Sequence, residues 1–468
     1  MRLLEICLVI SGIGLMGLAG WSYWWRRLPW TAVATLVGLT AVIGQAHLLI
    51  EGYRWQMWGG YVLAVGGAVA IVAGTVPTWI RKRPSWRVLI GSGGGLVVMG
   101  ILSLVVPVLL PVPKLAAPSG PYVVGTQTFY MVDGSREETH TEEPGDVREL
   151  MVQVWYPAAK QMGPEATYVD NALVTGAAVA EQFGLPSFLM NHINLAPTYT
   201  YVGAPVAQNG PFPVIVFVHG LSGVRGQNMF QVTELASQGY VVVAADHPYG
   251  NAATVYPDGR VAAHDSGLYV EGEVTAEKGR FLIDIWVEDV AFILDELERL
   301  NGMEGVITLD GQMDLERIGV MGHSTGGGTM WVFCQEDPRC DVGLGLDAWL
   351  RPISDYAATV EREVPTLFMS TETWLGEENM ALGEELLGNL GDEGGWFMIA
   401  DTNHYTFSDF PFLTPLSGQI GLTGDLPVER GAEIIKQYTV AFFDKHLKGE
   451  GDDELLEGAN VYEEVEWR

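Results

Sequence analysis

The residues best suited to chemistry lie in the run RIGVMGHSTGGG, at positions 317–328, around Ser324. A serine hydroxyl is a weak nucleophile unless it is held exposed beside a base. A sharp turn from a strand into a helix holds it so, and the small residues Gly322 and Gly326 let the backbones pass closely. An apolar strand pattern precedes Ser324 and a helical pattern follows it. The context therefore predicts a nucleophile at Ser324 rather than an ordinary glycine-rich turn.

A base must accept the proton of that serine, and in this kind of turn the chain order is serine, acid, histidine. Only His404 and His446 follow Ser324. His446 lies inside the last helical pattern, where a surface or capping role is the default. His404 lies in a loop directly after a predicted strand, where catalytic residues usually sit. We predict His404 as the base, with His446 as the alternative.

The acid that orients the histidine should also lie where a strand ends. Asp347 follows the apolar run VGLGL directly, so it should emerge at the carboxyl edge of the sheet, where active sites of such sheets lie. Glu372, after the next strand, is the alternative. We predict Asp347.

Two backbone N–H groups should hold the negative charge of the acyl-transfer intermediate. Thr325, the residue after the nucleophile, should provide one, and Leu221, in the loop VHGLSG after an early strand, the other. His219 precedes the serine and is predicted to brace this loop, and His247 is predicted to be structural. Neither a metal-binding constellation nor a phosphate-cradling loop is recognisable, so the sequence implies no metal and no cofactor.

Strand and helix patterns alternate over roughly 300 residues, which predicts an α/β fold with a doubly wound, mostly parallel sheet. Several strand patterns are continuous apolar runs, as expected where both faces of a sheet are covered. The predicted strands are 150–155, 214–218, 240–245, 317–321, 342–346, 366–369 and 396–400. The predicted helices are 227–238, 275–300, 325–335 and 428–447.

Four apolar stretches precede this part, and each approaches the roughly 20 residues that a helix needs to cross a bilayer. They cover about 3–25, 30–50, 58–80 and 88–111. A cleaved signal peptide would explain the first but not the next three. His47 is the only ionisable residue well inside a predicted span, which favours an anchor over a transporter.

Charge divides the chain at the same place. Residues 1–113 hold eight basic and two acidic residues, and residues 114–468 hold 18 basic and 55 acidic ones, a net charge of −37. An acidic surface repels phosphate backbones, so nucleic acid is excluded as an expected partner. Basic residues concentrate in the first and third joints between spans, which should therefore be cytoplasmic. This bias predicts a multi-pass plasma-membrane protein with an extracytoplasmic acidic part.

Three cysteines occur in the chain. Cys7 lies in an apolar run, and no zinc spacing surrounds Cys334 and Cys340. Two unpaired thiols are the first expectation for that pair, and a small disulfide loop is the alternative.

The whole set of motifs resembles the platelet-activating factor acetylhydrolase family, the calcium-independent phospholipase A2-like serine esterases of the α/β-hydrolase superfamily. The resemblance rests on VFVHGLSGVRG, LASQGYVVVAADHP, GHSTGGG, LDAWLRP and NHYTFSDF, and covers roughly residues 118–450. It implies Ser324 as nucleophile, Asp347 as acid, His404 as base, and the Leu221 and Thr325 amides as oxyanion hole. It also implies hydrolysis of short or oxidised sn-2 acyl groups of phospholipids.

The resulting organisation is a membrane domain at 1–113, a linker at 114–125, an α/β-hydrolase domain at 126–450 and a solvated acidic tail at 451–468.

The expected partner is a lipid or small ester. Residues 158–208, with Phe188, and the loop after His404 should line an acyl pocket, touch the bilayer or complete the core. A short-chain carboxylesterase or lipase, an acyltransferase, and a catalytically dead membrane-anchored binding module are the alternative functions.

Overall fold

The computed structural model describes residues 1–25, 30–74, 86–269, 273–302, 309–357, 362–390, 394–451, 453–458 and 461–468. The chain divides into two compact units. The helical unit contains Met1–Pro113 with Leu413–Leu416, and the sheet unit contains Lys114–Phe412 with Ser417–Arg468.

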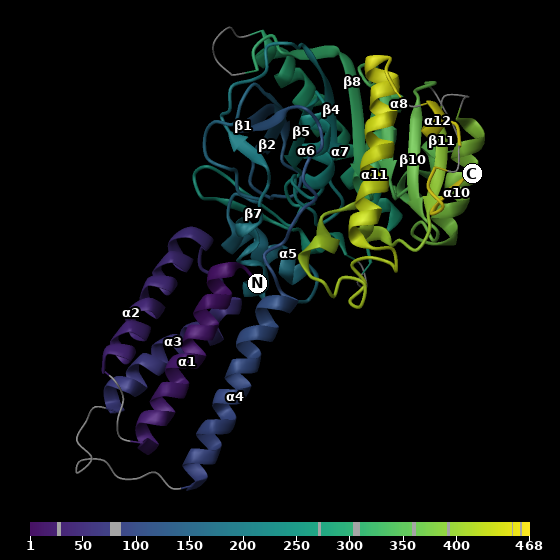
Figure 1. Cartoon of the computed structure of the whole chain (residues 1–468). Coiled ribbons are helices and arrows are strands. Elements are labelled where there is room, and N and C mark those ends of the chain that lie inside the picture. Colours follow the sequence, from purple (N-terminus) through teal and green to yellow (C-terminus); the bar gives the residue numbers. More distant parts are fainter. Residues whose placement is uncertain are drawn as a thin grey trace. The chain divides into compact units, whose positions relative to one another are not determined.

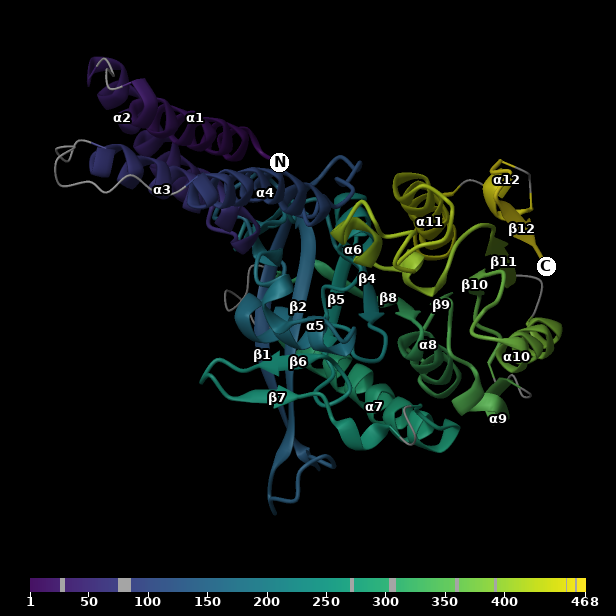
Figure 2. The same cartoon turned by 90° about the horizontal axis from the view of Figure 1, so that it is seen from below.

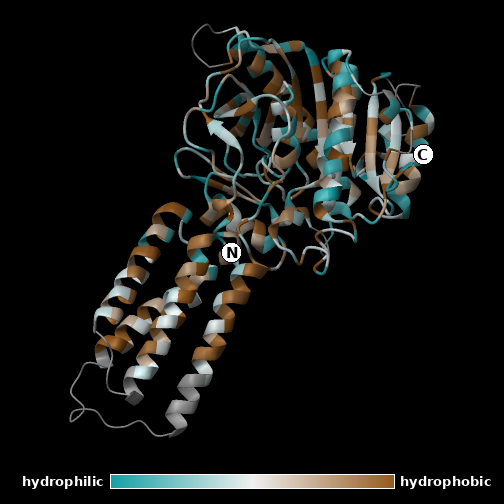
Figure 3. Ribbon diagram, in the orientation of Figure 1, coloured by the Kyte–Doolittle hydropathy of each residue, from teal (hydrophilic) through white to brown (hydrophobic). Residues whose placement is uncertain are grey.

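The helical unit consists of α1 (Leu3–Trp25), α2 (Trp30–Ala46), α3 (Trp58–Gly74) and α4 (Trp86–Leu109) (Figure 1). Apolar residues run along these helices (Figure 3). Among the described residues, three segments are long and apolar enough to cross a membrane: Leu3–Trp21, Thr31–Glu51 and Trp55–Val72. Within α4 the described residues include a shorter apolar stretch, Gly94–Leu109. The basic joint residues 26–27 and 81–83 lie outside the described residues.

Polar side chains are buried at one end of these helices. Glu5 and Arg54 are fully buried, and the Arg54 guanidinium donates to both Glu5 oxygens at 2.7 and 2.6 Å. His47 lies 3.0 Å from Glu51 and 2.8 Å from the Tyr61 hydroxyl. Glu5 and Arg54 are paired because a buried charge requires a bonded partner. His47 is therefore not the only ionisable side chain buried among these helices, since this unit also buries Glu5 and Arg54.

In the described residues, the sheet unit is built on ten strands in the order β12-β11-β10-β9-β8-β4-β5-β2-β1-β3. Six neighbouring strands in the middle are parallel. They are β4 (Phe212–Val218), β5 (Val241–Asp246), β8 (Met313–His323), β9 (Val342–Leu346), β10 (Thr366–Thr371) and β11 (Gly395–Ile399). These are the continuous apolar runs of the sequence, and nearly all of their residues are buried.

The margins of the sheet are mostly antiparallel. β2 (Val147–Ala158) pairs with β5 and with the long β1 (Val123–Glu137), and the short β3 (Thr200–Val202) is parallel to β1. At the other margin β12 (Val465–Trp467) pairs antiparallel with β11.

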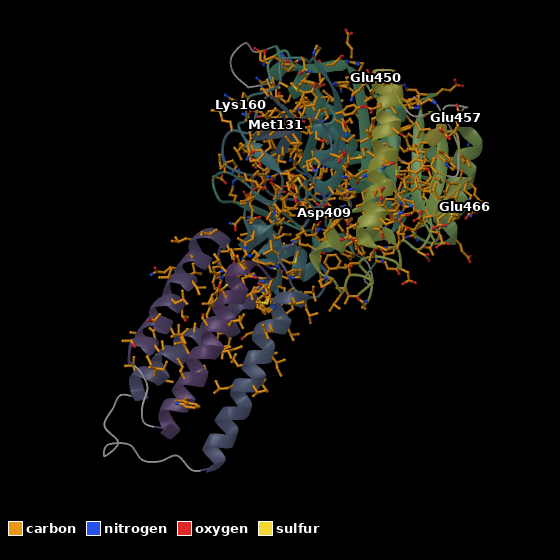
Figure 4. All side chains as sticks on the ribbon, in the orientation of Figure 1. Met131, Lys160, Asp409, Glu450, Glu457 and Glu466 are labelled. Carbon is orange, nitrogen blue, oxygen red and sulfur yellow. A yellow bond between two sulfur atoms is a disulfide. The ribbon has the colours of Figure 1, made fainter. Side chains whose placement is uncertain are left out.

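The expectation of a wholly solvated tail at 451–468 was therefore wrong. Val465 is buried in β12, because the margin strand β11 leaves backbone groups that a further strand can pair. The acidic side chains Glu450, Glu457 and Glu466 remain exposed (Figure 4).

Helices cover both faces of the sheet, as a doubly wound arrangement requires. α6 (Met229–Ser237) and α11 (Val428–Phe443) lie on one face, and α7 (Ala276–Asn301) and α8 (Thr325–Glu336) on the other (Figure 2). The apolar stripe of α7, which includes Ile293, packs into the main core. Further elements, which the sequence patterns did not predict, are α5 (Ala177–Gln182), the hairpin of β6 (Ala253–Val255) and β7 (Val261–Ala263), α9 (Ser354–Ala357), α10 (Glu377–Asn389) and α12 (Asp453–Leu456).

Cys334 and Cys340 form a disulfide, so the first expectation of unpaired thiols was wrong. Cys334 lies in the last turn of α8, and Cys340 lies just before β9. The chain reverses between them, with the Cys340 amide donating to the Asp337 carbonyl, and brings the two Cα atoms to 5.0 Å. Spacing alone did not reveal this reversal. Cys7 is a free cysteine.

Candidate active site

Ser324 occupies a strained turn between β8 and α8. Its φ is 56° and its ψ −118°, a conformation that costs a non-glycine residue free energy and persists only where surrounding structure enforces it. A Cβ on Gly322 would lie 2.0 Å from the Gly326 carbonyl oxygen, and a Cβ on Gly326 would lie 2.1 Å from that of Val218. Both glycines are therefore required by close backbone approach. Ser324 is partly exposed, whereas its neighbours on either side are buried.

His404 and Asp347 form a hydrogen-bonded pair at the carboxyl edge of the sheet. Asp347 directly follows β9, and its Oδ2 lies 2.6 Å from Nδ1 of His404. Its Oδ1 accepts from the Thr371 amide at 2.8 Å and from the Thr371 hydroxyl at 3.1 Å. The Asp347 carboxylate is fully buried, and the His404 side chain is 24% exposed. This arrangement fixes the imidazole and leaves its Nε2 available for chemistry.

The two alternative residues lie elsewhere. Glu372 is exposed and accepts a hydrogen bond from the Asp401 amide at 3.2 Å. His446 lies in the π-helical turn Asp444–Lys448 after α11, where its ring packs on Phe442. Neither takes part in the His404–Asp347 pair.

His323, the residue before the predicted nucleophile, connects Ser324 to the loop of His404. Its Nε2 lies 3.0 Å from the His404 carbonyl oxygen, and the two imidazole centroids are 4.6 Å apart. Its Nδ1 lies 2.8 Å from Nε2 of Gln227. Because the Gln227 amide donates, Nδ1 accepts, and the single proton of a neutral ring then sits on Nε2 and is donated to His404. Sequence reasoning assigned no role to His323, neither its contact with Gln227 nor its bond to His404, although it fills the variable position directly before Ser324.

Burial, together with the neighbouring His404, lowers the pKa of His323 from 6.5 to about 3. The unfolded chain, with a histidine pKa near 6.5, therefore binds more protons than the folded one below that pH, and stability falls as pH falls. At pH 5 we expect the titration of His323 to lower the free energy of unfolding by about 2 kcal/mol, relative to neutral pH.

The prediction is tested with His323→Gln in the detergent-solubilised protein, by urea unfolding at pH 7.5 and pH 5. The variant should be less stable than the wild type at pH 7.5, and this difference should shrink by about 2 kcal/mol at pH 5. A difference that is independent of pH would contradict a neutral buried His323.

The predicted oxyanion donors differ from their neighbours in hydrogen bonding. Gly220 N donates to Gln227 Oε1, Ser222 N to the Gly250 carbonyl, and Gly223 N to the Gly220 carbonyl. The Leu221 amide has no acceptor among the described residues. The amide of Thr325 begins α8 and so lacks an acceptor one turn earlier. A Cβ on Gly220 would lie 3.3 Å from Cβ of Ser324, so the loop adjoins the serine.

Two groups of side chains lie beside the predicted site residues, one next to His404 and one next to Leu221. Tyr405, next to His404, packs edge-on against Phe183 and Phe410 at centroid distances of 5.5 and 5.7 Å. Ser222, next to Leu221, has its hydroxyl 3.4 Å from His264 Nε2 and 3.3 Å from the Tyr269 hydroxyl. Phe188, which was expected to line an acyl pocket, touch the bilayer or complete the core, is 48% exposed.

Asp409 joins the loop of His404 to the start of α6. Its carboxylate accepts from the amides of Met229 and Phe230 at 2.8 and 3.2 Å, and from the Tyr168 hydroxyl at 2.8 Å. Burial raises the pKa of Asp409 to about 7. Asp409 thus caps a helix that is remote in sequence, a role that no local pattern could indicate.

One group of side chains in the described residues has metal-like spacing. Single ligand atoms of Glu5, His47 and Glu51, in the helical unit, lie within 4.8 Å of one another. Arg54 and Arg2 already bind Glu5, so its charge is balanced by guanidinium groups. The donor set therefore does not fit a divalent cation well.

The known proteins that are similar to this chain are hydrolases and esterases. The family model described as platelet-activating factor acetylhydrolase, isoform II, matches residues 111–273 and 294–461. The dienelactone hydrolase family model matches residues 199–372. Platelet-activating factor acetylhydrolase of Cavia porcellus is 27% identical over 340 residues, which is 65% of this chain and 77% of that protein. The Bos taurus protein of the same name is 26% identical over 384 residues, 74% of this chain and 81% of that one.

A solved structure is also similar. The ferulic acid esterase from Streptomyces cinnamoneus matches with a TM-score of 0.62 and 26% identity, over 76% of this chain and 99% of that chain. The α/β-hydrolase expectation for the sheet unit is thereby confirmed.

Proposed function

This chain belongs to the platelet-activating factor acetylhydrolase isoform II family and is a carboxylic ester hydrolase, and from that premise we propose a serine-dependent mechanism at Ser324. His404 is the general base, Asp347 its orienting acid, and the amides of Leu221 and Thr325 are the oxyanion hole.

The reaction is acyl transfer through a covalent intermediate. His404 Nε2 takes the Ser324 proton as the serine oxygen attacks the ester carbonyl. The carbonyl oxygen becomes an oxyanion held by the two amides, and His404 returns the proton to the departing alcohol. Water then attacks the acyl-enzyme with the same base and releases the acid.

The observation that carries the proposal is the 2.6 Å contact between His404 Nδ1 and Asp347 Oδ2 beside a strained serine turn. The contact requires the proton on Nδ1, which leaves the Nε2 lone pair free to accept from a hydroxyl. His323 connects the two parts, since it precedes Ser324 and hydrogen-bonds the His404 backbone. Replacement of Ser324 tests the proposal and is developed in the Discussion.

For the substrate, we propose phospholipids with a short or oxidised sn-2 acyl group. The relatives that are named platelet-activating factor acetylhydrolases support this class. An apolar aromatic group beside the base also suits a lipid, because the leaving alcohol must lie next to His404 to receive its proton. A simple carboxylesterase and an acyltransferase remain the alternative functions. Aromatic acyl esters are an alternative class of substrate, because the similar solved structure is a ferulic acid esterase.

A substrate panel tests this choice in the detergent-solubilised protein. We expect kcat/KM for an sn-2 acetyl phospholipid to exceed that for its long-chain analogue and that for methyl ferulate by at least about 10-fold, a difference of about 1.4 kcal/mol in transition-state binding. Ser324→Ala controls for hydrolysis by contaminants. Equal values across the panel would leave a generic esterase, and transfer of the acetyl group to added alcohol in preference to water would favour an acyltransferase.

We also propose that 1–113 is a membrane domain whose four helices α1–α4 cross the bilayer, and that the sheet unit, which begins at Lys114, is the catalytic domain and lies outside the cytoplasm. The three long apolar segments support an anchor, and tethering near a bilayer raises the effective concentration of lipid esters.

Protease treatment of intact cells tests this topology. We expect digestion of the acidic part without lysis, while a cytoplasmic control protein stays intact. A catalytic domain that is protected until lysis would reverse the orientation.

A further inference from the structure

His219 is fully buried beside the proposed oxyanion loop and has no part in the proposed chemistry. It directly follows β4, and its Nδ1 lies 2.7 Å from the Gly220 carbonyl oxygen. Its Nε2 accepts from the His247 amide at 3.2 Å. A backbone amide can only donate, so Nε2 carries the lone pair, and a neutral ring then carries its proton on Nδ1 and donates it to Gly220.

The Gly220 carbonyl belongs to the same peptide group as the Leu221 amide. A peptide group is planar, and in its trans form the C=O and N–H point in opposite directions. The Gly220 oxygen accepts from His219 Nδ1 and also from the Gly223 amide at 2.9 Å. These two bonds fix the carbonyl on one side, and the Leu221 N–H must point to the other.

Contacts with Trp286 and His247 fix the position of the His219 ring. Its ring packs edge-on against Trp286 at 5.0 Å, and the His247 ring stacks on the same Trp286 at 4.6 Å. His247 Nδ1 lies 2.8 Å from the buried carboxylate of Asp289, which Arg148 binds through two nitrogens at 3.0 and 2.7 Å. The pKa of His219 is held well below its ordinary value by burial and by His247, so the ring stays neutral.

We propose that His219 is a positioning residue that directs the Leu221 amide toward the oxyanion, anchored through His247 to Asp289. The inference rests on the proposed function, because it assigns a direction to the amide that is meant to stabilise the transition state. Loss of this direction should weaken binding of the transition state more than that of the substrate.

Two substitutions separate the hydrogen bond to Gly220 from simple filling of space. His219→Asn retains a nitrogen at the δ position, which can still donate to the Gly220 oxygen. His219→Gln moves its nitrogen to the ε position, toward His247 and away from that oxygen. His446→Gln, in the π-helical turn after α11, is the matched histidine control, and the melting temperature reports whether each variant is folded.

The measurements are kcat and KM for p-nitrophenyl acetate, and the inhibition constant of an aryl trifluoromethyl ketone, which forms an oxyanion on the serine. For His219→Gln we expect kcat to fall roughly 10- to 100-fold with KM changed less than about 3-fold, and the inhibition constant to rise by the same factor as kcat falls. For His219→Asn the loss should be below about 10-fold. His446→Gln should match the wild type.

Equal losses of kcat in the Asn and Gln variants, unchanged kcat in both, or a change in KM alone would each overturn the proposal. The proposed function fails separately. If Ser324→Ala is inactive and His219→Gln retains full kcat, only the positioning role is wrong. If Ser324→Ala retains wild-type turnover, the serine mechanism itself is wrong.

Discussion

Ser324→Ala is expected to lower kcat/KM for p-nitrophenyl acetate by about 10⁴-fold or more, because in the proposed mechanism Ser324 alone forms the acyl-enzyme. The substitution removes one oxygen from a partly exposed position, and the turn is enforced by Gly322 and Gly326. The melting temperature should therefore stay close to that of the wild type. A fluorophosphonate probe should label the wild type at Ser324 and leave the variant unlabelled.

Ser354→Ala is the matched control for this experiment. Ser354 is an exposed serine at the start of the short helix α9. Its activity and labelling should equal those of the wild type. Wild-type turnover by Ser324→Ala would contradict the serine mechanism at Ser324 and point to a different nucleophile.

Asp347→Asn is expected to lower kcat by about 10⁴-fold with a small effect on KM. The shape of the side chain is retained, but the asparagine amide can donate to His404 Nδ1. The imidazole proton would then sit on Nε2, so the ring could not accept the Ser324 proton. The effect is therefore on the tautomer, and it should appear in the rate of acylation measured by a pre-steady-state burst.

Glu372→Gln is the control for the choice of acid. Glu372 was the alternative in the sequence, and in the structure it is exposed and contacts the Asp401 amide. We expect its kcat to stay within about 3-fold of the wild type. Full activity of Asp347→Asn together with a large loss in Glu372→Gln would reverse the assignment.

The sheet and its principal helices were predictable because their signals are local. Buried parallel strands appear as continuous apolar runs, and long helices such as α7 carry an apolar stripe of period 3.6. The margins were not predictable in the same way. The three residues of β3 and of β12 carry too few side chains for a period, and their pairing depends on partners elsewhere in the chain.

The candidate site shows the same division. The sequence by itself determined the strand–turn–helix at Ser324, where two glycines at fixed spacing are required by backbone contacts within the turn and with β4. It also determined the chain order that singled out His404 and Asp347, because each directly follows a strand pattern.

Only the tertiary structure decided how these parts are held together. The bond from Thr371 to Asp347, the bonds of His323 to Gln227 and His404, and the cap of α6 by Asp409 each join segments far apart in sequence. The disulfide and the bond from His219 to Gly220 depend on how the chain turns after a helix or a strand. Side-chain direction in such contacts is set by packing of the whole unit, which residue types and spacing do not record.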